Sequence, residues 1–122
     1  MRLLADSAVF VVALLHLVFM ALEMYFWNKP IGHKIFGLKP DFASSTSRLA
    51  ANQGLYNSFL AGGLIWSLLT VQFAWNLQVF FLGCVIIAGV FGGITTHRLI
   101  IWIQALPGVI ALILVFLAQS NY

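Results

Sequence analysis

The sequence predicts an all-α integral membrane protein, organised as a four-helix bundle. Three observations lead to this prediction: 62% of the 122 residues are hydrophobic, only 7% are charged, and four apolar segments have the length of a membrane span. Soluble domains carry about 25% charged residues, and a small soluble domain leaves too much surface exposed to hide so many apolar side chains. Lipid removes this conflict, and helices satisfy their own backbone hydrogen bonds in it.

The four predicted spans form a single transmembrane domain of residues 1–122. A spanning helix needs about 20 predominantly apolar residues. The first apolar run extends to Trp27, which is longer than the core of a cleaved signal peptide, so we interpret it as an uncleaved span. Pro107 lies inside the last span. The predicted spans are residues 3–27, 49–73, 76–94 and 99–118.

The connections between the spans predict the orientation of the protein. Residues 28–48 form a long basic loop in this prediction, and basic loops stay in the cytoplasm. The sequence therefore predicts a multi-pass protein of the bacterial inner membrane, a cell membrane, with both termini outside. The loops on the predicted cytoplasmic side hold Lys29, Lys34, Lys39, Arg48 and Arg98, whereas the other side holds Arg2.

The net charge of +3 does not indicate a nucleic-acid partner. The six basic residues are separated by apolar runs and form no stripe that follows a phosphate backbone. The single cysteine, Cys84, lies in an apolar run and has no partner for an intramolecular disulfide, so we interpret it as a packing residue.

Polar residues within the spans are the candidates for function, because ionisable groups inside a membrane are costly. His16 and Glu23 are seven residues apart and share one helix face, which Trp27 extends. His97 ends the third span, and Gln104 lies about one turn into the fourth. The second span opens with a polar patch formed by Asn52, Gln53, Tyr56 and Asn57.

The predicted topology places all of these polar groups at the cytoplasmic end of their spans. We therefore expect them to line one pocket in the inner leaflet, with His16 deepest and almost no polar groups in the outer half. Structural roles are the alternative. The amides can simply join helices, Glu23 can pair with Lys29 or Arg98, and His16 can be a neutral hydrogen-bonded side chain. The motif Gly89-x-x-x-Gly93 predicts close helix packing, either within one chain or at the face of a homodimer.

The sequence predicts no metal site and identifies no cofactor. His16, Glu23 and His97 are residue types that bind metals, but they do not follow the spacings of known helical metal sites. No nucleophile elbow, phosphate-binding loop or nucleotide-binding fingerprint is recognisable.

Three stretches of the sequence resemble a bacterial membrane family known as DUF1304. They are residues 16–27 (HLVFMALEMYFW), residues 34–38 (KIFGL) and residues 51–57 (ANQGLYN). The resemblance extends over nearly the whole chain and implies a small multi-span membrane protein. It draws attention to the same polar residues, and it implies no particular reaction.

The favoured function is a pocket that binds a small lipophilic or amphipathic molecule from the bilayer. Glu23 and His16 are the candidate catalytic pair for acid–base chemistry, such as isomerisation or the handling of a quinone-type molecule. The candidate ligand-binding residues are Trp27, Asn52, Gln53, Tyr56, Asn57, His97 and Gln104. One alternative is a proton-coupled exporter acting as a homodimer, by analogy with small four-span exporters that carry a carboxylate in the first span. Another is a structural membrane subunit without catalysis.

Overall fold

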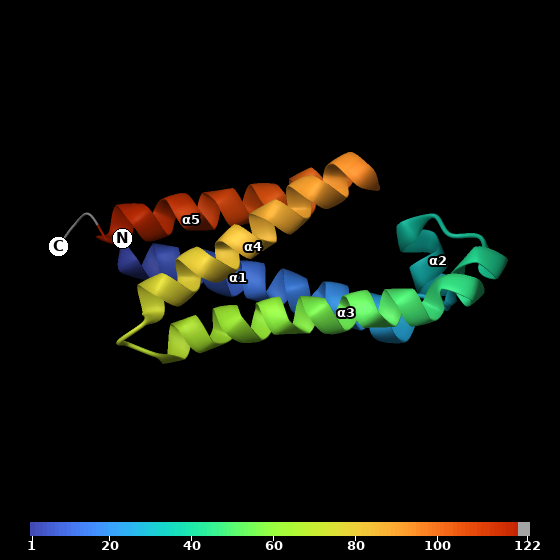
Figure 1. Cartoon of the computed structure of the whole chain (residues 1–122), viewed down its shortest axis with the longest axis horizontal. Coiled ribbons are helices and arrows are strands. Elements are labelled where there is room, and N and C mark those ends of the chain that lie inside the picture. Colours follow the sequence, from blue (N-terminus) through green and yellow to red (C-terminus); the bar gives the residue numbers. More distant parts are fainter. Residues whose placement is uncertain (120–122) are drawn as a thin grey trace. The chain divides into compact units, whose positions relative to one another are not determined.

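All regular elements in the part of the chain that the computed structural model describes, residues 1–119, are helical (Figure 1). This confirms the predicted all-α class. Two elements, named η, are π-helical turns, in which backbone hydrogen bonds skip one residue more than in an α-helix. The elements are α1 (Arg2–Ala21), η1 (Leu22–Phe26), α2 (Pro30–Phe36), α3 (Pro40–Leu69), α4 (Ala74–Thr95), η2 (Ile101–Ala105) and α5 (Leu106–Gln119).

The chain divides into two compact units. Unit 1 contains Met1–Leu15 and the chain from Leu60 onward, and unit 2 contains His16–Phe59. The buried core of unit 1 draws side chains from α1, α3, α4 and α5. Its members are Ala5, Val9, Val12, Ala13, Leu64, Leu82, Val85, Ala111 and Val115.

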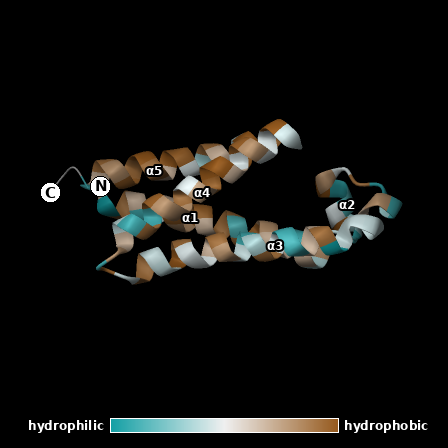
Figure 2. Cartoon of the chain, viewed as in Figure 1, coloured by the Kyte–Doolittle hydropathy of each residue, from teal (hydrophilic) through white to brown (hydrophobic). Residues whose placement is uncertain are grey.

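Three helical stretches within the described residues are long and apolar enough to cross a membrane: Arg2–Phe26, Ala74–Thr95 and Ile101–Gln119. The chain is therefore a transmembrane protein. Helix α3, which contains most of the predicted second span, is not among the three. Polar residues interrupt its apolar sequence, visible as teal and white turns between brown ones in Figure 2. The fourth span, and with it the four-helix bundle, stays a prediction.

The Gly89-x-x-x-Gly93 motif packs helix α4 against η2 of the same chain. A β-carbon on Gly89 would lie 2.7 Å from the backbone nitrogen of Ala105, and one on Gly93 would overlap the side chain of Ile101. Both glycines are buried. Of the two roles considered for this motif, close packing within one chain is the one that the structure supports.

Residues 28–48, predicted as a loop, are largely helical, so this part of the prediction needs correction. Pro30 and Pro40 occupy the first positions of α2 and α3, where the missing N–H and fixed φ of proline favour helix initiation. Gly37 ends α2 in the left-handed conformation, at φ 64°, which glycine adopts without a steric penalty. Helix α3 consequently begins at Pro40 instead of Leu49, and it ends at Leu69 instead of Phe73.

The predicted fourth span contains a change of helix type. The π-helical turn η2 ends immediately before α5, and Pro107 is the second residue of α5. A proline inside a helix removes one backbone donor and crowds the preceding turn. A π-turn relieves this crowding while keeping the helix continuous, which membrane helices require.

Candidate functional site

The central feature of unit 2 is a buried carboxylate with two amide partners. Glu23, in η1, is only 8% exposed. Its Oε2 accepts a hydrogen bond from Asn57 Nδ2 at 2.7 Å, and its Oε1 accepts a longer one from Gln53 Nε2 at 3.4 Å. Gln53 and Asn57 lie one turn apart on α3 and so present their side chains on one face. The structure therefore brings together three residues that the sequence analysis selected separately.

Gly54 makes this arrangement sterically feasible. A β-carbon at Gly54 would lie 2.6 Å from Met24 Cγ, 3.1 Å from Glu23 Cβ and 3.1 Å from the carbonyl oxygen of Met20. Helix α3 therefore lies close to the end of α1 and to η1 beside Gln53. Because Gly54 follows Gln53 directly, the close approach places the amide donors within reach of Glu23.

The hydrogen-bond donors to Glu23 are neutral amides, and not Lys29 or Arg98, which the sequence analysis considered as alternative partners. An amide has both donor hydrogens and an acceptor oxygen. By turning over, it can bond either to a carboxylate or to the hydroxyl of a carboxylic acid. The cluster can therefore hold Glu23 in either protonation state without leaving a buried cation unpaired.

His16 is the other proposed catalytic residue, and it is 1% exposed. Its ring contacts Phe19 edge to face, with the ring centroids 5.5 Å apart. The seven-residue spacing separates the backbones of His16 and Glu23 by about 10 Å along a helix. A proton passing between their side chains therefore needs a bridging group, such as a ligand or water. Their action as a pair stays a prediction.

Trp27 has structural partners in unit 2. Its Nε1 donates a hydrogen bond to Thr46 Oγ1 at 3.0 Å, and its ring lies 4.9 Å from that of Phe36, centroid to centroid. Through these contacts Trp27, which follows η1, packs on both α2 and α3. A β-carbon on Gly32 would overlap the carbonyl oxygen of Phe26, so α2 also packs closely on the end of η1.

Among the described residues, no hydrogen bond joins Asn52 or Tyr56 to Glu23. Asn52 is exposed, and Tyr56 is 61% exposed and packs its ring against Phe59. His97 and Gln104 belong to unit 1. There the exposed His97 accepts a hydrogen bond from the backbone of Leu99, and Gln104 donates one to the carbonyl of Val85. One pocket shared by all these residues stays a prediction.

Both π-helical turns contain a polar residue that the sequence analysis selected: Glu23 in η1 and Gln104 in η2. π-Turns inside α-helices occur frequently at functional sites. The π-turn around Glu23 has no sequence signal comparable to Pro107, so sequence reasoning did not anticipate it.

A second polar cluster, in unit 1, corrects the expectation that the end of the spans holding Arg2 has almost no polar groups. Gln78, in the first turns of α4, is 6% exposed, and its Nε2 donates to Asp6 Oδ1 at 3.2 Å. Asp6 also pairs with Arg2 across one turn of α1, at 3.9 Å. Asp6 and Gln78 were not among the predicted site residues, although each is a polar residue inside an apolar run. The described residues contain no group of three or more His, Cys, Asp or Glu side chains arranged to hold a metal ion.

These observations define a class of protein: a small all-α membrane protein with a buried, amide-bonded carboxylate at the end of its first transmembrane helix. A model of the family described as "Protein of unknown function (DUF1304)" matches residues 10–116. The chain belongs to this family, as the resemblance indicated. Comparisons with curated proteins and with solved structures gave no match.

Proposed function

We propose that the protein binds a small lipophilic or amphipathic molecule beside Glu23 and converts it by acid–base chemistry. The observation that supports this proposal is the buried Glu23 carboxylate, whose oxygens are bonded to the amides of Asn57 and Gln53 and not to a cation. A buried carboxylate in a membrane helix is expensive to maintain and is commonly functional.

The proposed reaction is an isomerisation by proton transfer. Glu23 takes a proton from a carbon next to a carbonyl or double bond of the ligand, and the electron pair moves into that group. The proton returns at another position, so atoms and electrons balance without an oxidant or reductant. His16 relays or supplies the second proton through a bridging group, since the two residues are separated by about two helical turns.

The remaining candidate residues of unit 2 orient polar groups of the ligand in this proposal: Trp27, Asn52 and Tyr56. We further propose that α3 is the fourth span of a four-helix bundle in the bacterial inner membrane. Both termini then face outward, and the basic segment of residues 28–48 faces the cytoplasm. The basic residues of this segment support that orientation.

The experiment compares Glu23→Gln and Glu23→Asp with the wild type, all purified in mild detergent. Each protein is incubated in D₂O with lipids extracted from the source membranes, and mass spectrometry follows deuterium entering carbon positions of any lipid. We expect labelling of one lipophile by the wild type, partial labelling by Glu23→Asp and none by Glu23→Gln. Asp41→Asn, which changes an exposed carboxylate at the start of α3, is the matched control and retains full labelling.

Two results separate this proposal from the alternatives. Proton-driven flux in vesicles that requires Glu23, without labelling of any lipid, indicates an exporter. Equal labelling by the wild type and Glu23→Gln removes Glu23 from the chemistry. Circular dichroism and thermal unfolding show whether the variants fold, and we expect Glu23→Gln to fold because a neutral amide is cheaper to bury than a charge.

A further inference from the structure

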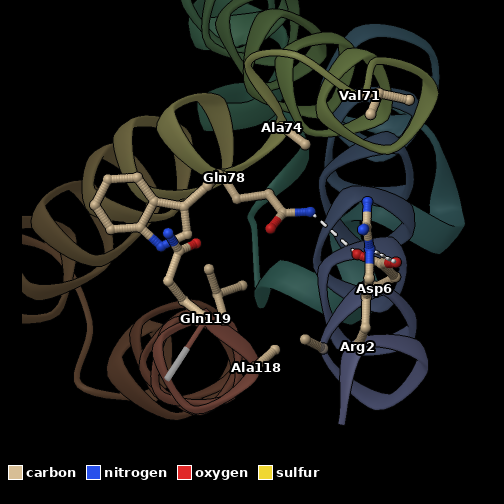
Figure 3. A pocket seen from close by; sticks show the side chains of 10 residues that line it. Arg2, Asp6, Val71, Ala74, Gln78, Ala118 and Gln119 are labelled. Atoms are coloured by element: carbon tan, nitrogen blue, oxygen red, sulfur yellow. Dashed lines mark hydrogen bonds and ion pairs between the residues drawn. The ribbon is translucent and has the colours of Figure 1, made fainter. Parts of the chain in front are cut away.

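Unit 1 contains a cavity of about 160 Å³ at the ends of its helices (Figure 3). The wall comes from the start of α1, the turn before α4 with the first turns of α4, and the end of α5. The lining residues are Arg2, Ala5, Asp6, Val71, Ala74, Trp75, Gln78, Val115, Ala118 and Gln119.

The polar groups of this cavity carry both signs of charge. Gln78, on α4, donates a hydrogen bond to Asp6, on α1, as the dashed line in Figure 3 shows. Arg2 lies one turn before Asp6 on α1. The Arg2 side chain is 59% exposed and that of Asp6 is 38% exposed, so both can contact a bound molecule. A carboxylate accepts about four hydrogen bonds, which leaves Asp6 able to accept more than Gln78 and Arg2 supply.

Trp75 adds a donor that lacks an acceptor among the described residues. Its indole Nε1 is buried, and the ring is held edge to face against Phe116 at 5.7 Å between centroids. Buried polar groups nearly always have hydrogen-bond partners. Trp75 also lines the cavity, so a molecule bound there can supply the acceptor if the side chains that cover the indole nitrogen shift.

The cavity adjoins the ends of the helical stretches that are long and apolar enough to cross a membrane. It is formed where two membrane-crossing stretches begin, at Arg2 and Ala74, and where a third ends, at Gln119. Helix ends of transmembrane segments lie at the boundary between hydrocarbon and water. Tryptophan and arginine are also the side chains that anchor proteins at this boundary.

We propose that this cavity binds the head group of an aminophospholipid, a zwitterion with a phosphate and a primary ammonium group. Arg2 and the Trp75 indole bind the phosphate, and Asp6 accepts hydrogen bonds from the ammonium. The opposite charges of Arg2 and Asp6 make the wall neutral, so a purely anionic head group would face Asp6 uncompensated. A quaternary ammonium has no N–H to donate, so it forms no hydrogen bond with Asp6.

The experiment measures binding of three short-chain phospholipids to the full-length protein, delipidated in detergent, by native mass spectrometry. The probes are dioctanoyl phosphatidylethanolamine, phosphatidylcholine and phosphatidylglycerol, together with soluble glycerophosphoethanolamine. We expect phosphatidylethanolamine to bind roughly tenfold more tightly than the other two lipids, as one charge-assisted hydrogen bond contributes. Tight binding of the soluble compound would identify a free head-group molecule as ligand, with the same chemistry, in place of a lipid.

Two variants test the assigned groups. Asp6→Asn retains an oxygen that accepts from Gln78 but removes the charge, so the preference for ethanolamine over choline is lost. Trp75→Phe retains the ring and removes the N–H, so all three lipids bind several-fold more weakly while the preference remains. Trp66→Phe, on the exposed face of α3, is the control. It changes neither the affinity for the three lipids nor the preference for ethanolamine over choline.

Equal affinity of the wild type for the three lipids overturns the proposal, as does an unchanged preference in Asp6→Asn. Circular dichroism establishes that each variant is folded. If Asp6→Asn does not fold, Trp75→Phe still tests the proposal. Unchanged phospholipid affinity in Trp75→Phe excludes the contact between the indole N–H and the lipid phosphate. None of these outcomes depends on Glu23.

Discussion

Replacing Gly54 with alanine tests whether close helix approach creates the Glu23 cluster. The added β-carbon would meet Met24 Cγ at 2.6 Å and the carbonyl oxygen of Met20 at 3.1 Å. The Met24 side chain can rotate away, but the Met20 carbonyl is backbone and yields only if the helices separate by a few tenths of an ångström. The 3.4 Å bond from Gln53 to Glu23 is already at the outer limit of hydrogen bonding and would be lost.

The expected free-energy change combines three contributions. Overpacking of a tight contact costs about 1–3 kcal/mol, and loss of one hydrogen bond in a membrane costs about 0.6 kcal/mol. The greater helix propensity of alanine returns about 1 kcal/mol. We therefore expect Gly54→Ala to lower the free energy of unfolding by roughly 0.5–2.5 kcal/mol.

Gly62→Ala is the matched control on the same helix, because a β-carbon there meets nothing within 4 Å. We expect it to leave the free energy of unfolding unchanged or to raise it by up to about 1 kcal/mol. Unfolding of both variants in mixed detergent micelles, followed by circular dichroism, supplies the comparison. If Gly54→Ala proves as stable as Gly62→Ala, the proposed dependence of the cluster on close approach is refuted.

Three further predictions address packing, the basic segment and topology. Gly93→Ala should lower the free energy of unfolding by about 1–3 kcal/mol. Gly83→Ala is the control, because a β-carbon there meets open space, and it should not lower the free energy of unfolding. Equal stabilities of the two variants would contradict the packing of α4 on η2. Trp27→Phe should cost about 1 kcal/mol, because it removes the bond to Thr46 but keeps the ring, and a double-mutant cycle with Thr46→Val should give a coupling energy above zero. Ser45→Cys, made in a variant that lacks Cys84, should react with a membrane-impermeant maleimide only after the cells are permeabilised. Labelling of this cysteine in intact cells would contradict the predicted orientation.

Several features of the protein followed from the sequence by itself. The scarcity of charge and the long apolar runs are sufficient to require helices in lipid, because no other local structure satisfies every backbone group there. Glu23, Gln53 and Asn57 were identifiable because polar groups are rare in such runs and therefore informative. Their spacing also predicted that the two amides share one helix face.

Tertiary structure decided which of the polar residues meet. The partners of Glu23 depend on the close approach at Gly54, and a glycine in a sequence does not reveal which helix it faces. The cluster of Asp6 with Gln78 joins residues far apart in the chain, so no local spacing could reveal it. The roles of Gly89 and Gly93 were likewise open until the structure placed Ala105 and Ile101 against them. Local sequence determines helix formation through short-range hydrogen bonding, whereas the pairing of helix faces depends on packing between distant segments.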